Sequence, residues 1–191
     1  MNQNKSLTHL DDRTQGVIYS GQVMDYILSD DGTFPNNARL PLLVYQGALE
    51  LGRNNPASIV EDLFESNGWS GSWRNGIYGF HHYHSTAHEV LGVYSGSAKV
   101  QMGGENGLTL TVRRGDVVII PAGVAHKNMG ASNDFRVVGA YPQGQHPDLC
   151  YGKARERPRT DQNIIKVPMP QKDPVHGTGG PMKEHWKCKT V

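Results

Sequence analysis

Four of the nine histidines and one glutamate fall within a single short segment, residues 76–96, with the sequence GIYGFHHYHSTAHEVLGVYSG. The five side chains are His81, His82, His84, His88 and Glu89. Imidazole nitrogens and carboxylate oxygens are ligands of divalent transition metals. The segment therefore predicts a metal centre, and the question is which of the five side chains reach the metal.

The parity of a β-strand divides these candidates into two sets. Side chains two positions apart share a face of a strand, so His82 and His84 point one way and His81 points the other. In the strand that follows, Glu89 lies on one face and His88 on the opposite one. Parity alone does not say which face is inside, so both sets remain open at this point.

A further candidate, His126, follows the segment GDVVIIPAGVA, in which an apolar strand ends in a Pro-Ala-Gly turn that aims the histidine back toward the sheet. Two histidines at alternate positions, a carboxylate and a distant histidine suit Fe(II), Mn(II), Ni(II) or Zn(II). Calcium or magnesium would require more oxygen ligands. A His-x-His pair alone is more often a surface feature than a metal site, so its context matters.

The elements that must position these residues are short strands, because 23 glycines and 11 prolines divide the chain into small pieces. At least six strands are expected within residues 77–141. Strands are predicted at residues 23–28, 42–45, 77–84, 89–94, 98–102, 108–112, 117–120 and 135–141, with a hairpin turn at 103–107.

One helix is predicted over residues 56–66. Pro56 suits the first helical position, Asn55 can cap the helix, and Asn67 with Gly68 ends it. Its apolar residues form one stripe, which comprises Ile59, Val60, Leu63 and Phe64. The helix is therefore expected to pack on a sheet.

The composition changes from residue 142 onward, where prolines, glycines and charges predominate. This composition predicts an extended tail that wraps the domain or a partner subunit rather than folding alone. Within it, residues 164–167 are predicted to form a short strand.

The overall charge argues against two classes of partner. With 19 basic and 18 acidic side chains, the chain has no electrostatic reason to bind nucleic acid or an anionic membrane.

No apolar run approaches the roughly 20 residues needed to span a bilayer, and the first residues lack the pattern of a secretion signal. We therefore expect a cytoplasmic protein that binds small molecules.

The histidine segment resembles the first motif of the cupin superfamily. That motif is a glycine, five residues, His-x-His, three or four residues, a glutamate, six residues and a glycine. This chain supplies Gly76, His82, His84, Glu89 and Gly96 with every spacing in range.

The second cupin motif is also present. It is a glycine, five residues, a proline, one residue, a glycine, two residues and a histidine, and it is met by Gly115, Pro121, Gly123 and His126. One position departs, because Gly130 stands where the family usually has an asparagine. This difference does not affect a ligand.

The resemblance implies an all-β dominated fold, the double-stranded β-helix or jelly-roll cupin barrel, with one short helix and an extended C-terminal tail. It implies one divalent transition metal (Fe, Mn, Ni or Zn) held by His82, His84, Glu89 and His126. If Glu89 faces the metal, His88 and His81 face away. They are then exposed or satisfied histidines, or they orient a ligand.

The rest of the sequence is similar to that of a bacterial single-domain group, the YjlB-like cupins. We expect one cupin domain over residues 1–191. Its parts are N-terminal strands and a helix packing on the barrel (1–70), the barrel core with both motifs (76–141) and the tail (142–191). The resemblance also implies a homodimer, because exposed edge strands need covering.

Two functions are compatible with such a site. The first is a metal-dependent enzyme, a dioxygenase or an isomerase, that acts on a small polar metabolite. The second is a non-catalytic binding or sensing module in which the metal anchors a small molecule. Tyr78 and Phe80 share the face of His82, and Asn128 shares the parity of His126, so these three are candidates to line the pocket or fill the barrel.

Overall fold

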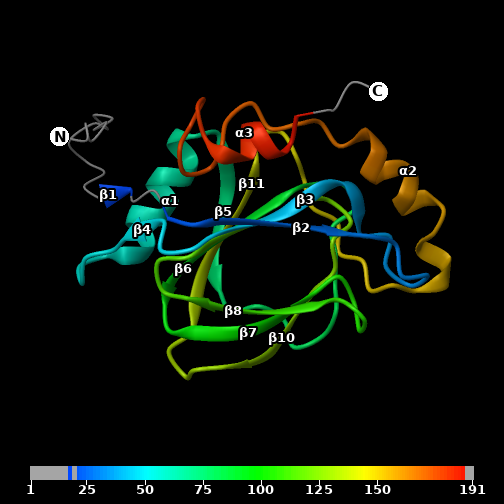
Figure 1. Cartoon of the computed structure of the whole chain (residues 1–191), viewed down its shortest axis with the longest axis horizontal. Helices are drawn as coiled ribbons and strands as arrows, with labels where there is room; N and C mark the ends of the chain where they lie inside the picture. The colour runs from blue at the N-terminus through cyan, green and yellow to red at the C-terminus, as the bar shows by residue number, and fades with distance from the viewer. Residues whose placement is uncertain (1–16, 19–20, 188–191) are drawn as a thin grey trace.

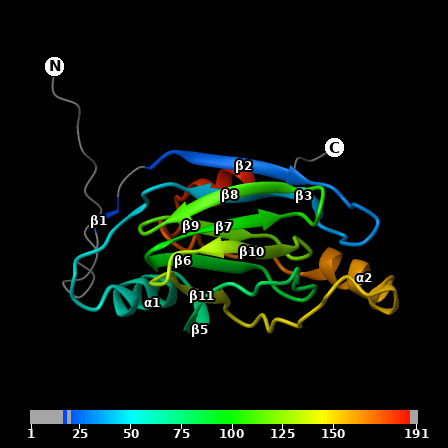
Figure 2. The same cartoon turned by 90° about the horizontal axis from the view of Figure 1, so that it is seen from below.

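Short segments rich in β-branched and apolar residues form antiparallel strands along most of the chain in the computed structural model, which describes residues 17–18 and 21–187. One sheet has the strand order β2-β3-β9-β6-β11-β5, and a second has the order β10-β7-β8. Figure 1 shows the smaller sheet below the larger one, and Figure 2 shows the same layers from below. The prediction of an all-β dominated jelly-roll barrel is confirmed.

The strands that face the barrel interior have the following bounds. The six-stranded sheet comprises β2 (Val23–Leu28), β3 (Asn37–Tyr45), β5 (Trp69–Asn75), β6 (Glu89–Ser95), β9 (Val117–Ile120) and β11 (Arg136–Pro142). The three-stranded sheet comprises β7 (Ser97–Met102), β8 (Leu108–Arg113) and β10 (His126–Ala131). A separate two-stranded ladder pairs β1 (Val17–Ile18) with β4 (Leu49–Glu50).

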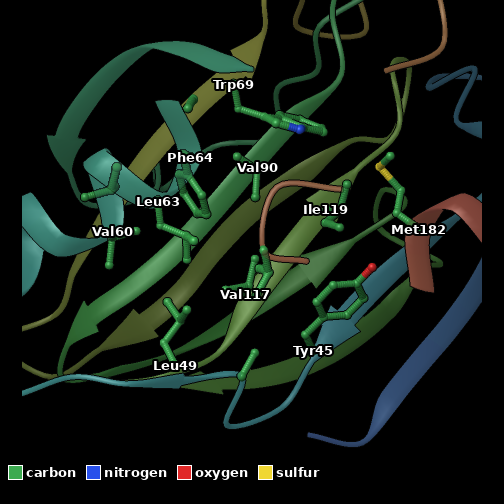
Figure 3. Packing of buried hydrophobic residues seen from close by; sticks show 14 of the residues in the cluster. Tyr45, Leu49, Val60, Leu63, Phe64, Trp69, Val90, Val117, Ile119 and Met182 are labelled. Atoms are coloured by element: carbon green, nitrogen blue, oxygen red, sulfur yellow. The ribbon is translucent and has the colours of Figure 1, made fainter. Parts of the chain in front are cut away.

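The centre of the six-stranded sheet is buried on both faces, which explains why its central strands are apolar without interruption. In β9, Val118 and Ile120 pack in the cluster between the sheets, whereas Val117 and Ile119 pack in the cluster on the outer face. Alternation therefore distributes one apolar run over two cores. Figure 3 shows the outer core, in which Val117 and Ile119 lie among side chains from the helices that cover the sheet.

Helix α1 (Pro56–Ser66) has the predicted bounds and covers the outer face of the sheet through Val60, Phe64 and their neighbours. It approaches closely because β6 has a glycine beneath it. A Cβ at Gly92 would lie 2.6 Å from the Val60 side chain and 2.9 Å from the Phe64 ring. Asn55 occupies the N-cap position as expected, but its backbone is left-handed, with φ of 48°, and its side chain makes no capping hydrogen bond.

The prediction of a regular strand at Ile77–His84 is wrong. The strand that precedes the histidines is β5, and the segment after it bends at Gly79 and Phe80. Only isolated bridges remain, between His82 and His126 and between Tyr83 and Cys150. Gly76 and Gly79 interrupt the β-rich run, and glycine weakens a strand interior.

The tail from residue 142 runs over the sheet but contains short helices, η1 (Ala154–Glu156), α2 (Arg159–Lys166) and α3 (Pro181–His185). The predicted strand at Ile164–Val167 is wrong, because these residues form the end of α2 and its cap. A short apolar run does not by itself distinguish a strand from a helix.

One buried carboxylate fixes the last part of the tail. Asp173 accepts hydrogen bonds from the Tyr45 hydroxyl at 2.6 Å and from the backbone N–H groups of Val175, His176 and Met182. Trp186 adds an indole hydrogen bond to the Pro41 carbonyl at 2.8 Å. The tail thereby completes the outer core.

The described ranges leave out residues 1–16 and 19–20 of the predicted N-terminal part and residues 188–191 of the predicted tail. Across residues 17–18 and 21–187, none of the helices is long and apolar enough to cross a bilayer.

Candidate metal centre

Three histidines from two segments lie together between the sheets. His82 and His126 are opposite each other in an antiparallel bridge, with hydrogen bonds of 3.2 Å from His82 N to His126 O and 2.9 Å in the reverse direction. Their ring centroids are 4.0 Å apart. His84, two residues along, shares their face, and one ring nitrogen of each histidine lies within 4.8 Å of the others.

Backbone carbonyls orient all three rings in the same way. The Nδ1 atoms of His82 and His126 lie 3.3 Å from the Phe80 carbonyl and 3.2 Å from the Val124 carbonyl, and His84 Nδ1 bonds to the carbonyl of Asp148. A carbonyl only accepts, so each Nδ1 carries the proton and each Nε2 keeps its lone pair. This is the tautomer that a metal-binding histidine requires.

Glu89 completes the group from the first position of β6. Its Oε2 lies 3.5 Å from His84 Nε2 and 3.3 Å from His126 Nε2, yet this buried oxygen has no hydrogen-bond partner. A carboxylate oxygen facing two nitrogen lone pairs is a repulsive arrangement unless a proton or a metal ion lies between them. The buried, unpartnered oxygen is the observation that favours a cation here.

The charges of the group depend on one another. Burial alone would raise the pKa of Glu89, but the neighbouring His84 and His126 lower it far below its usual range. Burial alone would lower the pKa of His84, but Glu89 and the Asp148 carbonyl raise it. Burial and the neighbouring His126 lower the pKa of His82 to about 3, so His82 is neutral and available as a ligand at neutral pH.

This donor set fits a transition metal. Three imidazole nitrogens and one carboxylate oxygen suit Fe(II), Mn(II), Ni(II) or Zn(II) rather than the oxygen-rich sites of calcium and magnesium. The four side chains also line a cavity of about 370 Å³, a size typical of small-molecule sites. Besides the ligands, the lining residues are Trp73, Arg74, Asn75, Gly76, Ile77, Tyr78, Leu91, Tyr141, Pro147, Asp148 and Leu149.

The three predicted pocket residues have different places. Tyr78 lines the cavity, with its ring 5.0 Å from that of His82 in an edge arrangement. Phe80 stacks on Tyr78 at 4.9 Å but does not itself belong to the lining. Asn128 is also outside the lining, and its side-chain oxygen accepts the backbone N–H of Gly130.

His81 and His88 are not part of the group. His81 lies on the other side of its segment, with its ring 5.3 Å from Phe34 and its Nε2 3.4 Å from Glu105. His88 is fully buried, where its Nδ1 accepts the backbone N–H of Ala122 at 3.0 Å. Both therefore lie apart from the cluster of His82, His84 and His126, and neither is an exposed side chain.

A sequence match now adds to this geometry. The family model described as the cupin domain matches residues 75–138, which contain all four candidate ligands. The chain is also 40% identical over 165 residues to "Uncharacterized protein YjlB" of Bacillus subtilis (strain 168), covering 86% of this chain and 97% of that protein. The chain belongs to the cupin superfamily. Within it, this cupin resembles the YjlB-like group.

Two solved structures are similar to this cupin at a coarser level. A DUF861 family protein from Thermotoga maritima has a TM-score of 0.30 and 22% identity, covering 47% of this chain and 94% of that one. A conserved protein with a double-stranded β-helix domain from Klebsiella pneumoniae has a TM-score of 0.34 and 16% identity, covering 80% and 100%. At this level of similarity, neither supports a statement about activity.

Sequence reasoning missed two residues that shape the cavity of this cupin. Tyr141 lines it at the end of β11, and its oxygen accepts the Trp73 indole N–H at 2.9 Å. Burial and then the charge of Glu89 raise the pKa of Tyr141, so the hydroxyl keeps its proton. The alternation from the inward Val137 could have identified Tyr141, because both lie on the same face of the strand.

The second missed residue, Asp148, comes from the tail. Its carboxylate accepts the Ser85 backbone N–H at 2.6 Å and the Ser85 hydroxyl at 2.5 Å, with the Cys150 thiol at 3.3 Å. Its backbone N–H donates to the Thr86 hydroxyl at 3.0 Å. These bonds hold the Asp148 carbonyl against His84 Nδ1, and no sequence pattern indicated this contact.

Proposed function

We propose that this cupin binds one divalent transition metal ion (Fe, Mn, Ni or Zn) through His82, His84, Glu89 and His126. The observation that carries the proposal is the buried Glu89 Oε2, which faces two imidazole nitrogens without a hydrogen-bond partner. A metal ion would satisfy all four donor atoms at once. The alternative, a proton held between Glu89 and a histidine, leaves the remaining nitrogen lone pairs unsatisfied.

We further propose that the site is catalytic, of the dioxygenase or isomerase type, and acts on a small polar metabolite. A metal ion of this class, held by His82, His84, Glu89 and His126, would supply Lewis-acid or oxygen chemistry to a substrate bound in the cavity. The chain itself contributes three functions. The cavity walls exclude water, Asp148 orients His84, and the Tyr141 hydroxyl can donate a hydrogen bond toward a bound oxygen atom.

The second candidate is a non-catalytic module in which the metal anchors a bound small molecule. One observation favours it, namely the shortage of a separate general base. Apart from the candidate ligands, the one carboxylate among the described lining residues is Asp148, and both its oxygens are engaged by Ser85 and Cys150. A base must be free to reach a substrate proton.

The metal proposal is tested by elemental analysis of protein purified without chelators, and by Ni(II) and Zn(II) titration of the metal-free protein. We expect about one ion per chain. His84→Ala should weaken binding more than about 100-fold, because it removes one of four ligands. His185→Ala is the matched control, because His185 lies on α3 beside Asp25 and outside the site. Equal metal binding by the two variants would contradict the proposal.

Catalysis and binding are then separated with the metal-loaded protein. Oxygen uptake or isomerisation across a metabolite panel supports the enzyme. If every metal form stays inert while a metabolite raises the melting temperature, the binding module is the correct function.

We also propose a homodimer. β2 and β5 form the two edges of the six-stranded sheet, and Ile27 on β2 is 53% exposed. An open edge with an exposed apolar side chain readily pairs with another chain. Light scattering should give twice the mass of the chain, and a monomer at micromolar concentration would contradict this proposal.

A further inference from the structure

The cavity offers a ligand little charge beyond the candidate metal. Among the described lining residues other than the ligands, the charged side chains are Arg74 and Asp148. The Arg74 guanidinium is already engaged by helix α1, because it donates to both Glu61 oxygens, at 2.7 and 2.5 Å, and to the Ser58 hydroxyl at 3.0 Å. A phosphate or a second carboxylate of a ligand would therefore find no free cation in these walls.

The walls away from the metal are apolar. Ile77, Leu91 and Leu149 line the cavity together with Trp73, whose indole N–H is used by the Tyr141 oxygen. The Trp73 ring lies over Gly139, where a Cβ would approach its atoms to 2.2 Å, so the backbone beneath it fixes its plane. Flat apolar surfaces of this kind bind flat apolar ligand groups.

Exposed aromatic side chains continue this surface outside the cavity. Tyr78 and Phe80 are 50% and 44% exposed and stack with an interplanar angle of 14°, and Tyr151 lies 5.8 Å from Phe80. With the cavity residue Leu149, these make up four of the eight large apolar side chains that are exposed in the described part of the chain. Their concentration at the metal site indicates a binding surface.

We infer that the cavity takes a ligand with one metal-chelating head and a flat apolar body without a second charge. The inference rests on the proposed metal site and specifies its substrate class. The head occupies the free positions at the metal beside Tyr141, and the body lies between Trp73 and Leu149 with Tyr78 at the mouth. Phosphorylated sugars and dicarboxylates do not fit this distribution of polarity.

Three hydroxamic acids test the inference, because they present the same bidentate head to a metal. Acetohydroxamate has no flat body, benzohydroxamate has one, and 4-carboxybenzohydroxamate adds a charge at the far end. Each is titrated calorimetrically into Ni(II)-loaded and metal-free protein. We expect benzohydroxamate to bind the loaded protein at least about tenfold more tightly than acetohydroxamate, as burial of a phenyl ring predicts. The 4-carboxy compound should lose most of that gain.

Variants identify the surface responsible. Tyr78→Ala and Leu149→Ala should each reduce the preference for benzohydroxamate over acetohydroxamate about threefold or more, and the Ni(II) affinity of each variant is measured alongside so that the preference is compared at equal metal loading. Ile165→Ala is the control, since Ile165 is 72% exposed on α2 and is not a lining residue. The melting temperature of each variant confirms that it folds.

The outcomes separate the two proposals. Failure of Ni(II) to bind overturns the metal site and this inference together. Metal binding with equal affinities for the three hydroxamates, or with the 4-carboxy compound favoured, overturns the inference alone. If Tyr78→Ala and Leu149→Ala leave the preference unchanged but convert a dimer to a monomer in light scattering, the aromatic surface covers a second copy of the chain and the inference is wrong.

Discussion

Asp148→Asn tests how the tail controls the metal centre, because it changes one oxygen to an amide nitrogen without changing size. The Asp148 carboxylate accepts from the Ser85 N–H and the Ser85 hydroxyl, and the Asn163 amide already donates to that hydroxyl oxygen. If the new NH₂ group turns toward the Ser85 N–H, two donors face each other; if it turns toward the Ser85 hydroxyl, that oxygen accepts a second hydrogen bond and the charge-assisted bond that the hydroxyl donates is lost. In either orientation the variant loses a hydrogen bond to a charged group beside His84.

The magnitude follows from these bonds. A hydrogen bond to a charged group contributes about 1.5–3 kcal/mol, so losing one should lower the free energy of unfolding by roughly 2 kcal/mol. The Asp148 carbonyl then no longer holds His84 Nδ1 in place. Loss of the partner that orients a metal-binding histidine typically weakens metal binding about 10–100-fold. We expect a weakening within this range for Asp148→Asn.

Competition with a chromophoric chelator measures the Zn(II) or Ni(II) dissociation constant, and urea denaturation of metal-free protein measures stability. Asp134→Asn is the control, because it makes the same chemical change at a carboxylate whose hydrogen bond with the Ser95 hydroxyl is exposed and which does not line the cavity. An unaltered metal dissociation constant in Asp148→Asn, with stability reduced, would mean that this residue anchors the tail but does not position His84.

Two further predictions concern the covered outer face of the sheet. Burial lowers the pKa of His88 to about 3, below its unfolded value of about 6.5, so the unfolded chain binds a proton first as pH falls and stability decreases from pH 6.5 toward pH 3. Between pH 6.5 and 5 the free energy of unfolding of the metal-free protein should fall by about 2 kcal/mol. The His88→Asn variant, which keeps an acceptor for the Ala122 N–H, should not show this fall in parallel urea titrations. Equal losses in the two proteins would refute the assignment to His88. Asp173→Ala leaves the Tyr45 hydroxyl and three backbone N–H groups without their acceptor. It should therefore lower the free energy of unfolding by at least about 3 kcal/mol. A thermal melt close to that of the wild type would contradict the anchoring role of Asp173.

Much of the barrel could be predicted because its strands have strong local patterns. Val23–Leu28 and Val117–Ile120 are strands with the predicted bounds, and helix α1 begins and ends as its apolar stripe and its Asn67-Gly68 stop indicate. The failures fall where partners decide the conformation. Ile77–His84 has β-forming residues but bends around the site, and Ile164–Val167 forms helix rather than strand beside Ser85.

The sequence by itself determined which residues are candidate ligands, because the spacing of His82, His84 and Glu89 survives any change in the surrounding elements. Parity divided the histidines into two sets, and the resemblance to the cupin motifs indicated that His81 and His88 are not ligands. Spacing and parity are properties of short segments, but the conformation of a segment such as Ile77–His84 is set by its partners.

Only the tertiary structure decided what surrounds the ligands. The Asp148 carbonyl on His84, the Trp73 hydrogen bond to Tyr141 and the pairing of Arg74 with Glu61 join residues that are 64, 68 and 13 positions apart. Such contacts depend on how the strands, the helix and the tail pack, and no local pattern encodes them. The motifs thus contain the candidate ligand set, whereas the orientation of these side chains and the polarity of the cavity follow from packing.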